Sequence, residues 1–448
     1  MRKSIDFLFR YEHKVREIES LMLIRLELER RGYSVEFIGN YEYNKEDDIF
    51  PKVFIAPAVY DNGQLRSDWM KYGPLKKIAN MMWEQLIGVK EEEDINGYHN
   101  PKEIGQRIVN FCWGKRSHDR IIRGGVREDR APIVGHINTD LLKSDFKENL
   151  FTKEQLASRY GIDDNKKWYL FVSSFAYCEM DEYQKKLCIA ARGADDFFRH
   201  EEVSLKSREA ILDWFELALN KDPDLIVIYR PHPDETARCI RLKEMSEKYT
   251  NFMVIGQEAM KHWVNACDKI YNWYSTGIVD AIVLKKTYRQ LRPFDIHAEN
   301  DYRMMHCARS IKKEDEFLED LYDTKYKDII QKDMFDSYYF FPEGYVYSKI
   351  CDILEEMLKT TKYDLDYTLS EKISIRYIHY KYMLLKPIKC LMLKFPLSYY
   401  PSFIKNRINK RNSYQDMLKN GYEKNVATDK ELRALSEKLR PGVYGEQV

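Results

Sequence analysis

Short apolar runs that alternate with amphipathic helical segments are the feature that most restricts the fold of this chain. Ile5 to Phe9 is apolar, Val15 to Arg31 mixes apolar and charged residues at helical spacing, and Ser34 to Ile38 is apolar again. Gly32 follows the helical segment at the position where a glycine commonly ends a helix. A strand, a helix and a second strand in this order predict a parallel sheet with helices on both faces.

The same rhythm occurs in two series, which indicates two α/β domains. In the first series, Val53 to Pro57 predicts a third strand, Lys76 to Leu86 a further helix, and Ile133 to Gly135 the last strand. A polar, lysine-rich connection follows, and Trp168 to Val172 opens the second series. A chain of 448 residues is long enough for two or three domains. We therefore predict two Rossmann-like domains at residues 1–150 and 151–360, facing a central cleft, and a helical, basic extension at 361–448.

Two loops of the second series carry the clearest signal of a binding site. Tyr229-Arg230-Pro231-His232-Pro233 follows the apolar run 225–228, and Tyr274-Ser275-Thr276-Gly277 follows the run 268–271. We expect both loops at the carboxyl ends of neighbouring parallel strands, where open α/β sheets bind ligands. Arg230 and His232 offer cationic and hydrogen-bonding groups, and Pro233 helps to fix the backbone. Ser275, Thr276 and Gly277 precede a predicted helix, which suits an anion, although they are equally suited to an ordinary helix cap. Together the loops predict a holder for a phosphate or diphosphate.

Two further loops of the second domain are weaker candidates for the same site. Ser173 and Ser174 follow the first strand of that domain and could contact a donor phosphate. Glu258 follows the strand that ends at Ile255, where it could accept hydrogen bonds from ribose hydroxyls. Serine pairs and single glutamates are also common in loops that bind nothing.

The first domain has to supply a base if the second domain holds an activated donor. Glu12, His13 and Glu17 lie at the end of the first predicted strand, and a histidine side chain titrates near neutrality, as general-base chemistry requires. Glu84 is a second candidate for the base. Arg16 and Tyr11 are candidates for holding the acceptor. The alternative is that Arg16 and Glu17 only form a pair on a helix surface.

Composition and motifs exclude several other classes of function. The formal net charge is +1, which gives no reason to expect nucleic acid as a partner. None of the eight cysteines lies in a CxxC or zinc-ligand spacing, and no DxD motif follows an apolar run, so we expect free thiols in a reducing compartment and no metal. Neither a phosphate-binding Walker loop nor a complete GxGxxG motif is present, and we expect no cofactor. With no secretory segment or apolar run long enough to span a bilayer, the protein is expected in the cytoplasm.

Residues 371–412 differ from the rest of the chain by their charge. They contain ten Lys or Arg residues against the single acid Glu371, with Tyr, Phe, Leu and Met between them. Such a segment is typical of a protein that lies on an anionic membrane surface, here the inner face of the cytoplasmic membrane. The alternative is a C-terminal helix that returns across the first domain with a solvated basic face.

Three segments resemble bacterial capsule and lipopolysaccharide biosynthesis proteins of the GT-B architecture. They are the opening at 11–19, the stretch from Val134 to Leu142, and the donor half with its His-Pro loop, Ser-Thr-Gly loop and Arg292-Pro293. The His-Pro and Ser/Thr pair is similar to that of sialyltransferases and Kdo transferases, which use CMP-sugars, and CDP-glycerol polymerases carry a related pair. The resemblance implies a metal-independent glycosyltransferase that moves a sugar from a nucleotide-sugar, with a CMP-linked acidic sugar favoured, to a surface polysaccharide or lipid-linked glycan.

Other functions fit the same residues and stay open at this point. A nucleotide-sugar 2-epimerase or a CDP-glycerol-type polyol-phosphate transferase would share the architecture and the phosphate-binding loops. A catalytically inactive binding partner in a capsule assembly complex would keep the fold alone. The loops cannot separate these functions because both of them contact only the phosphate.

Overall fold

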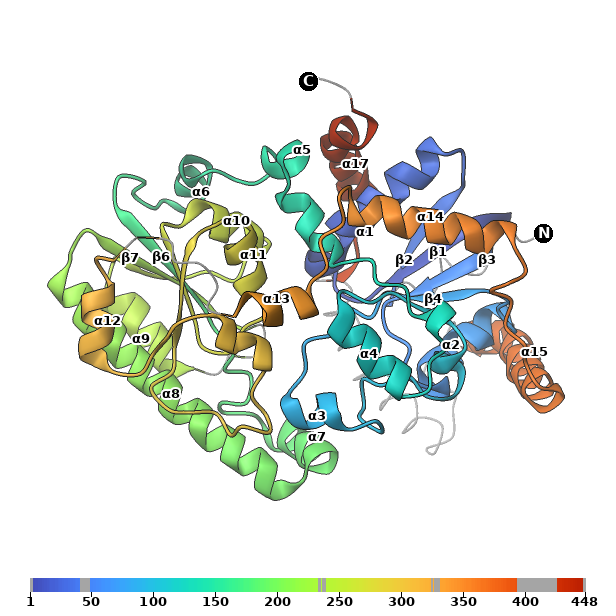
Figure 1. The fold of residues 1–448 in the computed structure, drawn as a ribbon, viewed down its shortest axis with the longest axis horizontal. Coiled ribbons are helices and arrows are strands. Elements are labelled where there is room, and N and C mark those ends of the chain that lie inside the picture. Colours follow the sequence, from blue (N-terminus) through green and yellow to red (C-terminus); the bar gives the residue numbers. More distant parts are fainter. Residues whose placement is uncertain are drawn as a thin grey trace. The chain divides into compact units, whose positions relative to one another are not determined.

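The structure, a computed structural model, describes residues 3–40, 49–232, 235, 239–323, 325, 331–392 and 425–445, with the backbone alone at 191–192 and 386–392. The chain forms two compact units (Figure 1). Unit 1 comprises residues 1–85, 95–140 and 339–448, and unit 2 comprises residues 86–94 and 141–338. The chain first enters unit 2 at residues 86–94, leaves unit 1 again after Asp140 and returns at Tyr339, whereas the predicted boundaries were at 150 and 360. The C-terminal residues belong to unit 1.

Unit 1 is built on a five-stranded parallel sheet with the strand order β2-β1-β3-β4-β5. The strands are β1 (Lys3–Tyr11), β2 (Val35–Gly39), β3 (Ile49–Ala56), β4 (Ile78–Asn80) and β5 (Val109–Asn110). The helices are α1 (Lys14–Arg30), α2 (Asn62–Tyr72), α4 (Lys115–Arg123), α14 (Val346–Lys359), α15 (Leu369–Met392) and α17 (Asp429–Tyr444), with short 3-10 helices at 103–106, 128–130 and 137–142. The opening strand, helix and strand were predicted from their pattern, and Gly32 ends α1 with a φ of +89°.

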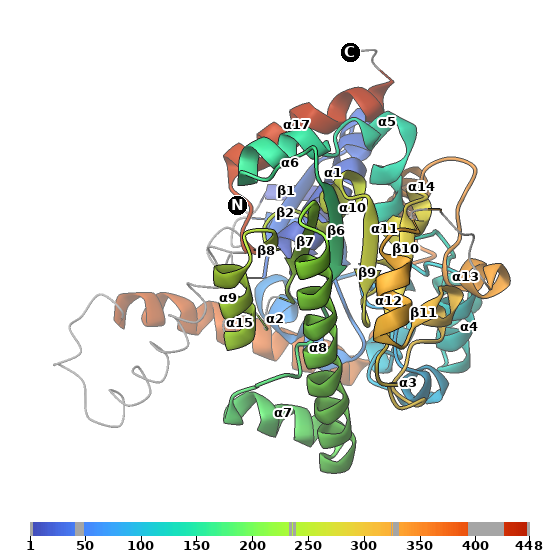
Figure 2. The same ribbon diagram turned by 90° about the vertical axis from the view of Figure 1, so that its left-hand side faces the viewer.

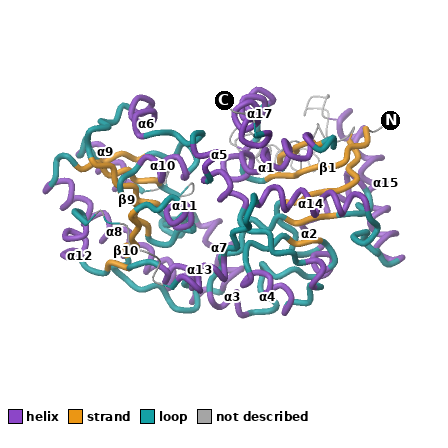
Figure 3. Tube along the Cα trace, turned by 45° about the horizontal axis from the view of Figure 1, so that its top comes forward, coloured by secondary structure: helices purple, strands orange, loops and turns teal. Residues whose placement is uncertain are grey.

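Helices cover both faces of the unit 1 sheet, and they bury the central part of β1 from Phe7 to Phe9. Leu8 and Phe54 share a core with Leu65 and Trp69 of α2 and with Ile375 of α15. On the other side α1 packs against α14 and α17 (Figure 3). Side chains alternate between the two faces of a strand, so a central parallel strand needs apolar residues at nearly every position.

The predicted helix at 76–86 is wrong, because the segment begins with the short strand β4 and continues as a loop. Asn80, at the end of β4, is fully buried. Its side chain donates to the Val59 carbonyl at 2.8 Å and to the Asn110 side chain at 2.9 Å. Bonds to the loop after β3 and to β5 satisfy this buried amide, and tertiary contacts of this kind override a helical spacing of apolar residues.

Unit 2 is built on a six-stranded parallel sheet with the order β11-β10-β9-β6-β7-β8. The strands are β6 (Lys167–Val172), β7 (Leu225–Arg230), β8 (Phe252–Val254), β9 (Lys269–Asn272), β10 (Thr287–Leu291) and β11 (Ser310–Ile311). The helices are α3 (Val89–Glu93), α5 (Ser144–Lys147), α6 (Lys153–Tyr160), α7 (Glu182–Arg192), α8 (Ala194–Lys221), α9 (Ile240–Lys248), α10 (Met260–Ala266), α11 (Ile278–Val283), α12 (Glu314–Asp320) and α13 (Lys332–Tyr338), with a 3-10 helix at 303–307.

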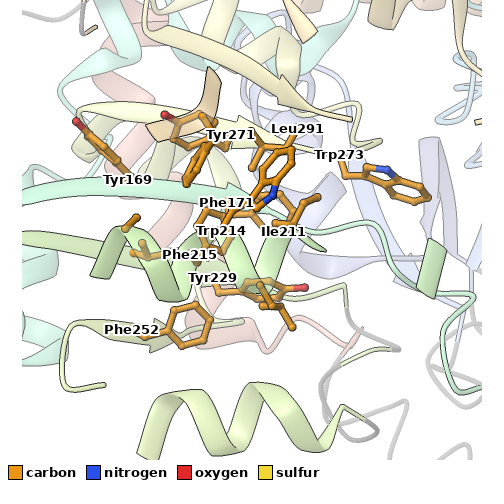
Figure 4. Packing of buried hydrophobic residues seen from close by; sticks show 14 of the residues in the cluster. Tyr169, Phe171, Ile211, Trp214, Phe215, Tyr229, Phe252, Tyr271, Trp273 and Leu291 are labelled. Carbon is orange, nitrogen blue, oxygen red and sulfur yellow. The ribbon is translucent and has the colours of Figure 1, made fainter. Parts of the chain in front are cut away.

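Aromatic side chains form the core between this sheet and α8, which runs across one face of it (Figure 2). Phe171 of β6 lies 5.3 Å from Phe215 of α8, measured between ring centroids, and 5.1 Å from Tyr229 of β7 (Figure 4). Phe175, just beyond β6, stacks on Trp273, just beyond β9, at 4.6 Å. These contacts fix the ends of three adjacent strands, which are the ends that carry the predicted loops.

Gly135 is required where the chain returns to unit 1 at residue 339. It has a φ of +101°, and a Cβ there would lie 2.5 Å from the Phe340 carbonyl oxygen and 2.9 Å from Val346 Cγ2. We expect Gly135→Ala to lower the free energy of unfolding by about 2 to 4 kcal/mol, the sum of left-handed strain and overpacking. Gly32→Ala is the matched control, because Gly32 also has a positive φ but no atom within 4 Å of its Cβ position. Urea unfolding of both variants measures the difference, and equal losses would contradict the steric explanation.

Candidate functional site

Four loops of unit 2 leave its sheet at the carboxyl ends of adjacent strands, which we call one edge of the sheet. The strands β9, β6, β7 and β8 are parallel and adjacent in this order, so the loops that follow them leave the sheet on the same side. The loops after β7 and β9 were predicted to follow neighbouring strands, but β6 lies between the two strands. The segment after β6, which begins with Ser173, therefore separates the His-Pro loop from the Ser-Thr-Gly loop.

A buried carboxylate, that of Glu235, holds the His-Pro loop in place. Glu235 is 1% exposed. It accepts hydrogen bonds from the Ser173 hydroxyl, from the Tyr229 hydroxyl at 2.6 Å and from the His232 backbone N–H at 3.2 Å. Its own N–H donates to the His232 carbonyl at 2.9 Å. Burial raises the pKa of Glu235 although these hydrogen bonds oppose the shift, and burial also raises that of Tyr229. We call Ser173, Tyr229 and Glu235 the Glu235 network.

The Glu235 network changes the role expected for Ser173. Its side chain is buried and bonded to Glu235, and its hydroxyl also accepts from the Phe175 N–H at 3.3 Å. Ser173 therefore supports the His-Pro loop through Glu235, and its hydroxyl is not exposed to a ligand. Ser174 and the His232 side chain are both half-buried at this edge of the sheet. Pro233 lies outside the described residues.

Arg230 joins the His-Pro loop to the loop after β8. Its guanidinium donates to the carbonyl oxygens of Gln257, at 2.7 Å, and Glu258. Burial lowers its pKa to about 10, a value at which it remains charged near neutral pH. Its bonded partners are carbonyl groups, which carry no net charge, and the Glu258 carboxylate acts on it through a weaker charge interaction that opposes the effect of burial.

Glu258, the residue predicted for a ribose contact, has its carboxylate paired within unit 2. Its backbone has a φ of +63°, and its carboxylate pairs with Arg159 and accepts from the Tyr160 hydroxyl at 3.2 Å. Both partners belong to α6. A non-glycine residue in the left-handed region is uncommon, so the β8 loop has a defined conformation. The side chain of Glu258 is therefore occupied by α6.

The loop after β9 has a compact, internally bonded backbone. The buried Asn272 side chain donates to the Ser275 carbonyl at 2.8 Å, and the Ser275 hydroxyl accepts from the Gly277 N–H at 3.2 Å. The Ser275 hydroxyl therefore closes the turn before α11, whose N-cap is Gly277, and Thr276 is exposed. A Cβ at Gly277 would collide with the end of the Met260 side chain, so the space above Gly277 is filled by a flexible side chain.

In unit 1, Glu17 organises the turn between β1 and α1. Its carboxylate is fully buried and accepts from the backbone N–H groups of Glu12, at 3.0 Å, and His13, at 3.2 Å. Arg16 donates to the same carboxylate at 2.9 Å. Burial raises the pKa of Glu17 while Arg16 opposes the shift. Glu17 is therefore a positioning residue for this turn, since its oxygens are already occupied.

Glu84 lies at the other end of the same charged cluster. Its carboxylate is 3.2 Å from Arg16 and 3.2 Å from Nε2 of His99. The hydrogen bond with His99 and the charge of Arg16 lower the pKa of Glu84 to about 2, in spite of partial burial. A carboxylate with so low a pKa is a weak base near neutral pH. Glu12 is half-buried, and one of its oxygens is 4.0 Å from Arg16.

His13 and Tyr11 differ sharply in their surroundings. His13 is exposed at the start of α1, and its ring makes no hydrogen bond or ion pair with any other described residue. Of the two exposed candidates for the base, His13 and Glu84, only Glu84 pairs with other charged side chains. Tyr11 is buried, and its hydroxyl accepts from the Ala427 N–H at 2.9 Å. Tyr11 therefore anchors the segment before α17, its hydroxyl is enclosed, and an acceptor contact by this residue stays a prediction.

Sequence reasoning missed Glu235 and His136. A lone glutamate after a His-Pro motif belongs to no pattern, and only the fold brings it against Ser173 and Tyr229. The ring of His136 lies 4.0 Å from that of Trp113, measured between centroids, and burial together with the charge of Arg16 lowers its pKa to about 3. A neutral imidazole is thus placed near the Arg16 cluster. The stretch from Val134 to Leu142 was noticed for its resemblance to a family segment and for a strand predicted at 133–135, where the structure has only an isolated bridge at Ile133.

No described helix is both long and apolar enough to cross a membrane. Within the described residues, no group of three or more His, Cys, Asp or Glu side chains is placed to hold a metal ion.

Comparison with known proteins shows the fold. No protein-family model matches the chain, and no curated protein matches it. A structure of the wall teichoic acid polymerase TagF matches over 80% of this chain and 90% of that one, with 11% identity and a TM-score of 0.50. A histidine-to-alanine variant of the same polymerase matches over 80% and 90%, with 12% identity and a TM-score of 0.51.

A UDP-GlcNAc 2-epimerase from Methanocaldococcus jannaschii, in complex with UDP-GlcNAc and UDP, also matches. It covers 79% of this chain and 100% of its own, with 13% identity and a TM-score of 0.46, which is too low to carry an argument. At these identities the likeness concerns the fold alone. The chain has two parallel-sheet α/β units, as GT-B enzymes have, together with C-terminal helices.

Proposed function

We propose that this protein is a GT-B transferase that moves a nucleotide-activated group to a surface polymer or its lipid-linked precursor. One observation carries the proposal: the His-Pro loop and the Ser-Thr-Gly loop lie on either side of β6 at one edge of the sheet, and the buried Glu235 network fixes the first of them. Four parallel strands direct their loops to that edge, where α/β sheets bind ligands. His232, the charge of Arg230 and the exposed Thr276 are the groups that we propose contact a phosphate there.

The proposed transfer requires the site to stabilise the negative charge of the leaving nucleotide. When a nucleotide departs, negative charge grows on its phosphate, and preorganised donors stabilise that charge more than mobile water does. His232 supplies a ring N–H on a backbone held by Glu235, and Arg230 supplies a fixed positive charge. In unit 1, His13 is an exposed candidate for accepting the proton of an attacking hydroxyl, with Glu17 and Arg16 holding the turn that carries it.

A cytidine nucleotide is the donor that we propose. The His-Pro and Ser/Thr pair resembles that of transferases that use CMP-linked acidic sugars. The fold is similar to that of the wall teichoic acid polymerase TagF. The second candidate function, polyol-phosphate transfer from a CDP-linked donor, is favoured by this structural likeness. Both candidates share the cytidine nucleotide and differ in the group transferred.

A thermal-shift screen of CMP, CDP, UDP, GDP and ADP at equal concentrations tests the proposal. A ligand present at about 100 times its Kd stabilises the folded state by about 2.7 kcal/mol, so the preferred base should give the largest increase in Tm. We expect CMP or CDP to give that increase. A larger effect of UDP, followed by epimerised product from a UDP-sugar without an acceptor, would overturn the transferase. The absence of a shift with any nucleotide would favour a binding partner in an assembly complex.

A further inference from the structure

Helix α15 exposes an apolar stripe, although its opposite face is packed into unit 1. On the packed face, Ile375 is buried in the core shared with α2, and Nδ1 of His379 lies 2.9 Å from the Met70 carbonyl oxygen. Glu371 pairs with Arg107. These contacts fix the rotation of the helix about its own axis, with α15 beside α2 (Figures 1 and 2). The orientation of every other side chain up to residue 385 follows from this rotation.

The outward face carries large apolar side chains at helical spacing. At 100° per residue these positions fall within about 80° of one another around the helix axis. Their side chains are between 60% and 76% exposed. We call this set the α15 stripe: Leu369, Ile373, Tyr377, Tyr380 and Leu384. Its first three members also line an open surface hollow of about 710 Å³, together with Ser370 and Ser374.

Positive charge borders the α15 stripe on both sides. Lys372 and Arg376 follow one edge, and Lys381 lies along the other edge with its ammonium 5.7 Å from the centre of the Tyr377 ring. Glu371 is the only acid between 369 and 385, and Arg107 neutralises it on the packed side. The sequence continues with seven Lys or Arg residues and no acid between 386 and 411. The exposed face is therefore apolar at its centre and cationic at its margins.

We propose that the α15 stripe docks unit 1 on an anionic lipid surface, with the helix lying in the plane of the interface. An interfacial helix buries its apolar side chains at the boundary between headgroups and acyl chains, and flanking Lys and Arg side chains reach the anionic headgroups. Tyrosines suit this depth because the ring is apolar and the hydroxyl is polar. A second copy of the chain is a poorer occupant, since two such faces would bring like charges together. This docking does not depend on the reaction proposed above.

Co-sedimentation of the full chain with vesicles tests the proposal. We expect the protein to sediment with phosphatidylcholine vesicles that contain about a quarter phosphatidylglycerol, and to sediment poorly with phosphatidylcholine alone. The triple variant Ile373→Ser, Tyr380→Ser and Leu384→Ser should bind at least about tenfold more weakly. Its matched control is Tyr183→Ser with Leu187→Ser on α7, which removes apolar side chains that are 72% and 53% exposed and should bind as the wild type does.

The charged margins are tested separately. Changing Lys372, Arg376 and Lys381 to Gln should weaken binding roughly a hundredfold at about 0.1 M salt, and less at higher salt. The control changes three exposed lysines of unit 2 to Gln, namely Lys206, Lys243 and Lys332. All variants should keep the wild-type Tm because the altered side chains are exposed.

Three outcomes would overturn the proposal. The first is a wild-type chain that does not sediment with the anionic vesicles. The second is vesicle binding as tight as that of the wild type by both the apolar and the charged α15 variants. The third is an apolar variant that lowers the oligomeric mass in light scattering while vesicle binding is unchanged, which would identify a second copy as the occupant.

Discussion

Replacing His232 with alanine should lower kcat by about two to three orders of magnitude, the usual effect of removing one donor that stabilises a growing negative charge. The fold should survive, since the imidazole is only half-buried and the backbone N–H of His232 keeps its hydrogen bond to Glu235. The measurement is transfer from the cytidine donor identified by the nucleotide screen, together with the Tm of the variant. We expect a Tm close to that of the wild type.

His297→Ala is the matched control for His232→Ala. His297 is an exposed histidine of the same unit, and its ring lies 3.5 Å from Arg199. The control should keep its turnover. Normal turnover in His232→Ala would remove the His-Pro loop from the proposed site. In cells, loss of the surface polymer with an unchanged amount of His232→Ala protein would argue against a role as a binding partner alone.

Replacing Glu235 with alanine should have the largest effect on stability among the site variants. Three donors, the Ser173 hydroxyl, the Tyr229 hydroxyl and the His232 N–H, lose their acceptor in a buried place. Buried donors without a partner are costly, so we expect the free energy of unfolding to fall by about 3 kcal/mol. Turnover should fall as well, because His232 would no longer be held in position. Glu247→Ala, at an exposed position of α9, should change stability by less than about 0.5 kcal/mol.

Glu235→Gln keeps the size of the side chain but removes its charge, so comparing the pH dependence of the free energy of unfolding in the variant and the wild type isolates the effect of the charge. Burial raises the pKa of Glu235 above its ordinary value of 4.5, so the folded state favours the protonated carboxyl. The contribution of this raised pKa to the free energy of unfolding is fully present below pH 4.5 and is lost as the pH rises through the folded-state pKa. Relative to Glu235→Gln, the wild type should therefore become less stable as the pH increases from 4.5. Urea unfolding at a series of pH values measures this difference, and a difference that grows in favour of the wild type would show that the carboxylate is held as an anion.

Local sequence patterns were sufficient to predict a strand or helix where the spacing of its own apolar residues decides its conformation. The spacing in α1 and the apolar run of β1 predicted the first strand and helix, because a buried parallel strand and an amphipathic helix impose different periods on the sequence. Residues 76–86 show where such patterns fail. Their apolar spacing fits a helix, but the buried Asn80 amide donates to the Val59 carbonyl in the loop after β3 and to Asn110 of β5, which only the fold brings close.

The candidate site was located by sequence but its internal roles were not. His232 and Ser275 were identified because they follow apolar runs, and that argument depends only on order along the chain. The bond between Ser173 and Glu235 joins residues that are 62 positions apart, and the enclosure of Tyr11 by Ala427 joins residues 416 positions apart. No local pattern encodes contacts of this range.

The sequence by itself determined that this protein alternates strands and helices in two series, that two loops suited to phosphate follow strands of the second series, and that a basic segment lies near its end. Each of these is a property of residues close together in the chain. The tertiary structure alone decided that β6 separates the two loops, that Glu235 supports one of them, and that α15 turns its apolar stripe outward. These depend on strand order and on the rotation of a helix, which are set by packing between distant segments.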